Sequence, residues 1–372
     1  MVEKSAHFSG KVGLQQRVLP DYRIPFIDQL SAACSQGLAL FAGDPRPAEA
    51  ISTGRQPEKA LLFKADNRHW LSGPLYLLRQ PGLLDWLEGW QPDVLVLEAN
   101  PRYLDNWRAL SWAQRRSLPV VGWGLGAPAL RDGKPVGAWL WHQFLNRFDA
   151  LIAYSSKGAS EYQLAGLPAE RISVALNAAI DNPPETMERQ PPSGRPLHLL
   201  FVGRLQPRKG VGRLLRACAD LGSERVELRI VGAGPDKARL KDLADQIFPQ
   251  AVFTGHQQGE SLKQSFAWAD LFVLPGTGGL AVQQAMAHAL PVVVAKGDGT
   301  QTDLVRANNG WLVKEDSASA LRETIAKALA NRQQLPDMGR RGAEIVRKEI
   351  NVSAMVQTFV ELFQIVSGVD GQ

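Results

Sequence analysis

A glycine-rich loop between two apolar runs is the first feature of this chain that could bind a ligand. Residues 270–295 read DLFVLPGTGGLAVQQAMAHALPVVVA, and a small-residue helix is predicted to begin near Leu280. Glycines let the backbone approach a ligand closely, and the first-turn N–H groups of a helix point at an anion. We therefore predict a phosphate site here, most simply part of a nucleotide site. Its loop residues are Gly276, Thr277, Gly278 and Gly279.

Two basic residues in a second glycine-rich loop could hold the same phosphate. The segment GRLQPRKG at 203–210 places Arg204 and Lys209 five residues apart. Arginine offers a planar fork of donors and lysine a compact charge, and both suit phosphate. A third turn, GAGP at 232–235, adds glycines that permit close approach. A solvated basic loop and plain strand-to-helix connections are the simpler interpretations of these two segments.

Alternating strands and helices are predicted on both sides of a proline-rich break. The break, NPPETMERQPPSGRP at 182–196, contains five prolines and is typical of a linker between domains. Strands that alternate with helices indicate parallel sheets. After the break, strands are predicted at 198–202, 226–231, 251–253, 271–274, 291–294 and 309–313, and helices at 211–221, 237–247, 261–268 and 319–331. Before it, strands are predicted at 38–42, 60–63, 94–98, 120–123, 150–154 and 172–176.

The composition indicates a soluble globular protein. A length of 372 residues suggests two or three domains, and 45% hydrophobic with 21% charged residues is ordinary for such a chain. We expect no membrane-spanning helix, since no apolar run reaches about 18 residues, and no signal peptide. Cys34 and Cys218 lie in separate halves without a Cys/His cluster, which favours a reduced, cytosolic protein without zinc. The net charge of +5 fits phosphate substrates, an anionic membrane surface or plain solubility, and nothing indicates nucleic acid.

Taken in order, the three loops resemble the C-terminal domain of the GT-B glycosyltransferases, specifically the large retaining nucleotide-sugar family called family 4. The segment 149–181, which ends in LNAAID, is similar to the family's segment before its hinge. The segment 297–313, GDGTQTDLVRANNGWLV, is similar to a later family run. The resemblance is detailed over about 149–331 and looser over 1–148, where GKVGLQQRVLPDYRIPF stands in for the usual N-terminal glycine loop.

The resemblance implies an α/β protein of GT-B fold, with two Rossmann-like, doubly wound domains facing across a cleft. Residues 1–181 would form an acceptor-binding domain, and a helix within about 352–372 would pack back on it. Residues 182–196 would be the linker, and 197–351 the domain that binds the nucleotide-sugar donor.

The resemblance also implies roles for residues at matching positions. Arg204 and Lys209 would be the catalytic residues that hold the donor diphosphate, and Gln284 would bind the ribose. No metal or other cofactor is expected, since no DxD triplet occurs. Further donor contacts would come from Gly13, Leu14, Gly203, Gly232, Gly255, His256, Gly276, Thr277, Gly278, Gly279 and Leu280.

The chain departs from the family at its Glu-x7-Glu motif. Gly276 stands where the first glutamate is expected, and Gln284 stands where the second is expected. The family's N-domain histidine is also absent, and Trp123 and Gly124 occupy that place. The loop PGTGGL matches a bacterial subgroup with Pro-Gly-x-x-Gly-Leu in place of the motif, to which we assign the chain.

Candidate acceptor or sugar contacts lie in the first half of the chain. Glu98 ends the predicted strand VLVLE, where a carboxylate faces a ligand or caps the next helix. The segment NWRALSWAQRRS at 106–117 mixes Trp with Arg, as membrane-surface helices do, although a helix with its aromatic face in the core has the same pattern. The other candidate contacts are Asn100, Trp123, Tyr22 and Arg23.

These features together predict a retaining glycosyltransferase. It would move a sugar from a UDP- or GDP-sugar to a sugar, lipid-linked or small-molecule acceptor, in cell-surface polysaccharide or glycolipid synthesis. The leaving phosphate would take the acceptor proton, so that no protein base is required. The expected location is the cytoplasm, including peripheral contact with the inner membrane face. Two alternatives stay open: an inactive GT-B protein that binds a nucleotide sugar or partners an active transferase, and a nucleotide-sugar epimerase.

Overall fold

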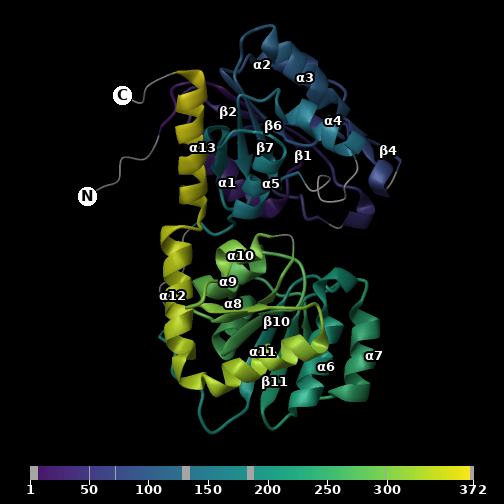
Figure 1. Cartoon of the computed structure of the whole chain (residues 1–372), viewed down its shortest axis with the longest axis vertical. Coiled ribbons are helices and arrows are strands. Elements are labelled where there is room, and N and C mark those ends of the chain that lie inside the picture. The colour runs from purple at the N-terminus through teal and green to yellow at the C-terminus, as the bar shows by residue number, and fades with distance from the viewer. Residues whose placement is uncertain are drawn as a thin grey trace, which may run out of the picture. The chain divides into compact units, whose positions relative to one another are not determined.

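The computed structural model describes residues 7–49, 51–71, 73–127, 135–181, 188–297 and 299–368. The chain divides into two compact units (Figure 1). Unit 1 comprises Met1–Asp181 and Val352–Gln372, and unit 2 comprises Asn182–Asn351. The start of the predicted linker, 182–187, lies outside the described residues. The chain therefore leaves unit 1 once and returns to it for its final helix.

Unit 1 is built on a seven-stranded parallel sheet with the order β3-β2-β1-β6-β7-β8-β9. Its strands are β1 (Val12–Val18), β2 (Leu38–Gly43), β3 (Leu61–Ala65), β6 (Val94–Glu98), β7 (Val120–Gly124), β8 (Ala150–Ala153) and β9 (Ile172–Val174). A separate antiparallel pair consists of β4 (Arg68–Trp70) and β5 (Leu77–Arg79). The strand order reverses its direction between β1 and β6.

Both faces of this sheet are covered, because successive strand residues point to opposite sides. In β6, Val94 and Val96 join one hydrophobic core, while Leu95 and Leu97 join the other. The first core is closed by α1 (Ile24–Ala32) and α13 (Val352–Ser367), which lie side by side (Figure 1). The second is closed by α2 (Leu83–Trp90), α3 (Leu104–Gln114), α4 (Pro135–Leu145) and α5 (Ser156–Leu164).

Unit 2 repeats the plan with a six-stranded parallel sheet in the order β12-β11-β10-β13-β14-β15. Its strands are β10 (Leu197–Val202), β11 (Val226–Val231), β12 (Val252–Gly255), β13 (Leu271–Leu274), β14 (Val292–Ala295) and β15 (Gly310–Val313). The helices are α6 (Val211–Leu221), α7 (Lys237–Ile247), α8 (Gly259–Trp268), α9 (Leu280–Ala287), α10 (Gln301–Leu304), α11 (Ala318–Ala330) and α12 (Leu335–Lys348). Helix α6 packs beside α7 and α11, and α9 packs beside α12. The order reverses between β10 and β13.

The stretch Arg332–Ser367 is long and apolar enough to cross a membrane by length and composition, although none was expected. It contains α12 and α13, and 50% of its most apolar window is buried inside the protein. Phe359 and Phe363 of α13 are fully buried in the core of unit 1. The apolar residues of α13 therefore supply that core.

The structure confirms the predicted fold class, two doubly wound α/β units, and corrects part of the N-terminal half. Residues 12–18 form strand β1, not part of a glycine loop. The β4–β5 pair and α12 were not predicted. Open sheets of this kind bind ligands beyond the carboxyl ends of their strands, at the point where the strand order reverses. A ligand is therefore expected at the carboxyl ends of β10 and β13 in unit 2, and of β1 and β6 in unit 1.

Candidate functional site

Two loops meet at the point of reversal in unit 2. Loop 203–210 follows β10, and loop 275–279 follows the neighbouring strand β13. The amide of Thr277 donates to the carbonyl of Arg208 at 3.1 Å, and Lys209 Nζ donates to the carbonyl of Thr277 at 2.6 Å. The loops predicted to hold one phosphate therefore lie against each other, with Lys209 between them.

Gly276 is at the closest approach of these loops. A Cβ atom at this position would lie 2.3 Å from the carbonyl oxygen of Arg208 and 2.5 Å from the carbonyl carbon of Lys209. Contacts this short to backbone atoms are not tolerated without moving the loops. The glutamate expected at 276 from the family resemblance is thus incompatible with the contact between the loops, which gives the glycine a physical reason.

The N-terminus of α9 borders the same place. Its N-cap is Gly279, which has no side chain to cap the first-turn amides, including that of Leu280. Gln284 lies one turn further along and is partly exposed. The fully buried Gln301 of α10 donates to the carbonyl of Gly278 at 3.0 Å and holds the loop from its other side. Gln301 was not among the predicted site residues. In the sequence it is one of several polar residues of the segment 297–313, and nothing else distinguishes it.

Two further loops follow β11 and β12, the strands on the other side of β10. A Cβ atom on Gly232 would lie 1.9 Å from the carbonyl oxygen of Gly203, so only glycine fits there. The amide of Gly232 also donates to the carbonyl of Gly255 at 2.7 Å. His256 follows and is exposed, with Nε2 2.9 Å from Gln258 Nε2. The structure therefore brings the predicted donor residues of unit 2 to one sheet edge, and their contacts with a donor stay a prediction.

Gly13 and Leu14 are not at a sheet edge. They lie near the amino end of β1 and are buried. A Cβ on Gly13 would meet Pro92 and Trp86 at 3.2 Å. The prediction that they approach the donor phosphates is therefore wrong, because the assumed loop is a strand. The loop that reaches the carboxyl edge begins after Val18.

In unit 1, Glu98 ends β6 at the reversal point. Its Oε1 accepts from the amide of Arg17 in β1 at 2.9 Å, and its side chain also bonds Tyr103. Burial raises the pKa of Glu98, and the bond from the Arg17 amide opposes that shift. Asn100 uses its Oδ1 to accept from the amide of Arg102 at 3.1 Å. Glu98 stands where a ligand of unit 1 is expected, whereas Asn100 shapes the turn before α3.

Arg23 and Tyr22 follow β1 at the same edge. Arg23 lies 4.3 Å from the ring centroid of Trp123 and 5.4 Å from that of Tyr154. Tyr22 is 40% exposed. Trp123 is only 1% exposed and packs against Phe359 at 5.0 Å between centroids. The predicted contact of Trp123 with an acceptor or sugar is therefore wrong, because its ring is buried; it instead packs against Arg23.

The tryptophans of 106–117 face inward. Trp112 is buried, and the indole of Trp107 donates to the carbonyl of Pro101 at 3.0 Å and packs on Phe144. The mixture of Trp and Arg is explained by core packing. It does not support a membrane surface on α3.

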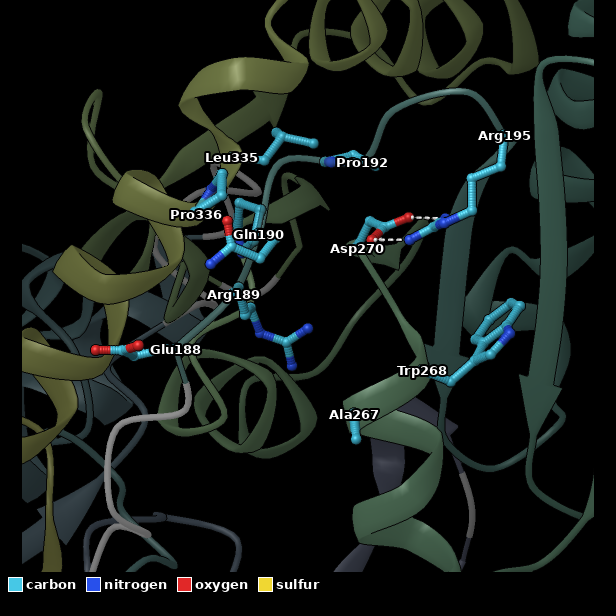
Figure 2. A pocket seen from close by; sticks show the side chains of 11 residues that line it. Glu188, Arg189, Gln190, Pro192, Arg195, Ala267, Trp268, Asp270, Leu335 and Pro336 are labelled. Atoms are coloured by element: carbon cyan, nitrogen blue, oxygen red, sulfur yellow. Dashed lines mark hydrogen bonds and ion pairs between the residues drawn. The ribbon is translucent and has the colours of Figure 1, made fainter.

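A separate cavity of about 240 Å³ lies near the amino ends of β10, β13 and β14, away from the loops described above (Figure 2). Arg195 on its wall forms an ion pair with Asp270 at 2.6 Å. Arg189 donates to the carbonyls of Phe266, Ala269 and His288 at the ends of α8 and α9. Burial lowers the pKa of Arg189 to about 10. These contacts fasten the second part of the predicted linker, residues 188–196, to unit 2 and assign no chemistry to the cavity. Among the residues that the structure describes, no three His, Cys, Asp or Glu side chains gather to hold a metal ion.

Comparison with known families identifies both parts of the chain. A family model described as glycosyl transferases group 1 matches residues 184–345. A second, described as a glycosyl transferase 4-like domain, matches residues 30–178.

Relatives that match most of the chain are also described as glycosyltransferases. A GDP-mannose-dependent alpha-mannosyltransferase of Mycobacterium tuberculosis is 32% identical over 275 residues, 70% of this chain and 70% of the relative. A protein of the same description from Mycolicibacterium smegmatis is 28% identical over 348 residues, 85% of this chain and 86% of the relative. The structure of Anabaena HepE in complex with UDP matches with a TM-score of 0.71 at 17% identity, over 95% of this chain and 99% of HepE. At that identity the likeness shows the fold alone.

Proposed function

The chain belongs to the glycosyl transferases of group 1, and on that premise we propose that it moves a sugar from a UDP- or GDP-sugar to an acceptor hydroxyl with retention of configuration. It is a glycosyltransferase of GT-B fold. The contact between loops 203–210 and 275–279 carries the proposal. It gathers Lys209, the Arg204 loop and the first-turn amides of α9 at the point of reversal in unit 2.

The proposed chemistry is a front-face displacement. The acceptor oxygen bonds to the anomeric carbon on the face from which the diphosphate leaves, and the hydroxyl proton passes to the leaving phosphate oxygen. Negative charge grows on the diphosphate, where Arg204, Lys209 and the amides of α9 would stabilise it. Gln284 would bond the ribose hydroxyls as donor and acceptor. In this scheme the charge is met by side chains and amides, and we propose that no metal or other cofactor is needed.

We propose that the nucleotide of the donor is either GDP or UDP. The mycobacterial relatives are described as dependent on GDP-mannose, and the HepE structure contains UDP. Backbone groups of Gly255 and the neighbouring His256 would contact the base in either case.

We place the acceptor at the carboxyl edge of unit 1. Glu98, Tyr22 and Arg23 stand there, and a partly buried carboxylate such as Glu98 suits a hydrogen bond from a sugar hydroxyl. The proposed acceptor is a sugar, a lipid-linked sugar or another small molecule of polysaccharide or glycolipid synthesis. The proposed location is the cytoplasm or the inner membrane face.

One observation favours an alternative function. Gly276 and Gln284 replace both carboxylates of the family motif, and the packing around Gly276 excludes a glutamate there. A protein that binds a nucleotide sugar without turning it over would have the same features.

Incubation with a panel of UDP-, GDP- and ADP-sugars separates the two functions. We expect slow donor hydrolysis, or transfer when acceptors are added, with one nucleotide class, in the presence and absence of EDTA. Neither hydrolysis nor transfer across the panel would overturn the proposed activity. Calorimetric binding without turnover would then establish the alternative.

A further inference from the structure

Strand β15 has an open edge. Among the described strands, it ends the sheet of unit 2 and pairs with β14 alone, where the carbonyl of Asn309 accepts from the amide of Val292 at 3.3 Å. Because the peptide groups of successive strand residues point alternately to the two sides, Gly310 and Leu312 direct their amides and carbonyls toward the outer edge. No hydrogen bond to these outward groups comes from any part of the chain that the structure describes. The outer edge of β15 is therefore able to pair with a further strand.

A groove of about 440 Å³ lies beside this edge, bordered by β15, α11 and the loop at 305–307. Gly310 and Leu312 line the groove, so the outward backbone groups of β15 border its space. The half-buried Leu312 and Ala320 give it an apolar part. An open strand beside such a groove is the geometry in which an extended peptide adds to a sheet, with affinity from the backbone and selectivity from the side chains around it.

The charged side chains of the groove are mostly basic. Lys314, after the end of β15, and Lys327 of α11 are exposed, and neither ammonium group has an ion pair or hydrogen bond within the described ranges. Arg306 also lines the groove, and its charge is balanced by an ion pair with Glu349. Among the described lining residues, Glu323 is the one acid. The two unpaired lysines therefore favour an occupant with negative charge.

An edge strand of unit 1 shows a different use of lysine. Lys64 of β3 forms an ion pair with Asp44 at 2.8 Å, so the chain itself balances that charge. Unbalanced lysines at a sheet edge prevent pairing between copies of one protein. Two β15 edges brought together would set Lys314 and Lys327 of both copies side by side, which disfavours a second copy of this chain as the occupant. An acidic strand would be attracted by the same two lysines.

From this geometry we infer that the groove between β15 and α11 binds an extended, acidic segment of a partner protein, which adds to the sheet of unit 2 as a strand beside β15. The inference concerns an interaction surface and goes beyond the proposed transfer reaction. Strands β13 and β14 separate β15 from β10, so the partner would occupy an edge other than the loop that carries Lys209. Loss of the partner surface should therefore leave donor hydrolysis unchanged.

Calorimetric titration of the full chain tests the groove with a defined probe, a short capped peptide in which glutamate alternates with valine. We expect saturable binding of one peptide per chain at low ionic strength, which weakens as salt is added. A peptide with lysine in place of glutamate should bind at least about tenfold more weakly. An acidic peptide that is N-methylated at alternate residues should lose a similar factor, since it cannot donate to the outward carbonyls of β15.

Variants of the full chain test which residues bind the peptide. Lys314→Glu and Lys327→Glu should each raise the dissociation constant of the acidic peptide about tenfold. Lys241→Glu, which reverses an exposed lysine on α7, is the matched control and should change nothing. Leu312→Pro removes an outward amide without removing a bond to β14, and edge strands tolerate proline. This variant should fold and should bind the peptide at least about tenfold more weakly.

Hydrogen exchange followed by NMR locates the bound peptide. The amide of Leu312 should exchange at least about tenfold more slowly in the saturated complex, whereas that of Trp311, which points to β14, should change little. No binding of the acidic peptide, equal binding of the lysine peptide, or binding that survives both charge reversals would overturn the inference. A dimer of the free protein that Leu312→Pro dissociates would also overturn it, because a second copy would then be the occupant. Donor hydrolysis is measured on the same variants, so failure of the groove and failure of the transferase are told apart.

Discussion

At the carboxyl edge of unit 2, loops 203–210 and 275–279 meet through backbone atoms, and glycines set the distance between them. At the carboxyl edge of unit 1, the contacts join side chains: Arg23 on Trp123, and Trp123 on Phe359. A backbone-lined edge suits a charged diphosphate, which any amide can bind. An edge lined by side chains suits a ligand that the protein must distinguish from others by its shape and charge. Removal of a side chain should therefore reduce mainly the activity at the edge of unit 2 and mainly the stability at the edge of unit 1.

The largest effect is expected from Trp123→Ala. The ring is fully enclosed, so its loss leaves a cavity and should lower the free energy of unfolding by about 3–5 kcal/mol. Trp139→Ala removes the same side chain from a position that is 62% exposed and should change stability by less than about 0.5 kcal/mol. Denaturant unfolding of both variants measures the difference. Equal losses of stability in the two variants would show that the buried ring of Trp123 does not stabilise the edge of unit 1.

Lys209→Ala should lower kcat/KM about 10²- to 10³-fold, as the loss of a charge-stabilising group does, while loss of its one hydrogen bond to Thr277 should cost only about 1 kcal/mol of stability. Arg204→Ala should behave in the same way. Lys241→Ala, an exposed lysine on α7, is the control for removing a charge from unit 2. Full activity in either loop variant would refute the phosphate assignment.

Gly276→Ala should push the two loops apart. The added Cβ would meet the backbone of residues 208 and 209, so we expect a loss of about 1–3 kcal/mol in stability and a raised donor KM. Gly54→Ala provides the control, since nothing lies within 4 Å of the Cβ there. Normal donor affinity in Gly276→Ala would show that the loop contact is dispensable for the donor.

The smallest effect concerns Glu98 and pH. Burial raises the pKa of this carboxyl, so its contribution to stability is full below the pKa of the unfolded chain and is lost as the pH rises through the folded pKa. Glu98→Gln should therefore unfold roughly a few degrees higher than the parent at pH 8 and converge with it near pH 4. Thermal midpoints across this range measure the effect, and parallel curves would show that Glu98 carries no shifted pKa.

The same difference between the two edges explains why more of unit 2 than of unit 1 could be predicted from the sequence. In unit 2 the expected 211–221, 226–231, 237–247 and 271–274 agree with α6, β11, α7 and β13. Strand β13 is a continuous apolar run, β11 alternates, and the helices place their buried residues on one face. The loops follow directly from strand ends, so the residues at the edge of unit 2 could be listed from motifs.

In unit 1 the first strand was hidden by polar residues inside the protein. Gln15 and Gln16 of β1 are buried, and Gln15 bonds Gln80, Asn106 and the amide of Glu98. A strand that carries a buried polar network lacks the apolar run by which strands are recognised. The surroundings of Arg23 were equally hidden, because its contacts come from positions 123, 154 and 177, and only the fold brings them together.

The last helix of the chain completes the core of unit 1, so this core can form only at the end of synthesis. Unit 2 is continuous in sequence and can fold as soon as it has left the ribosome, whereas the core of unit 1 waits for α13, which supplies Phe359 and Phe363. Until then the apolar face of α1 and the ring of Trp123 lack their cover. Nascent chains stalled before residue 352 should therefore recruit chaperones and be sensitive to protease in unit 1 while unit 2 resists.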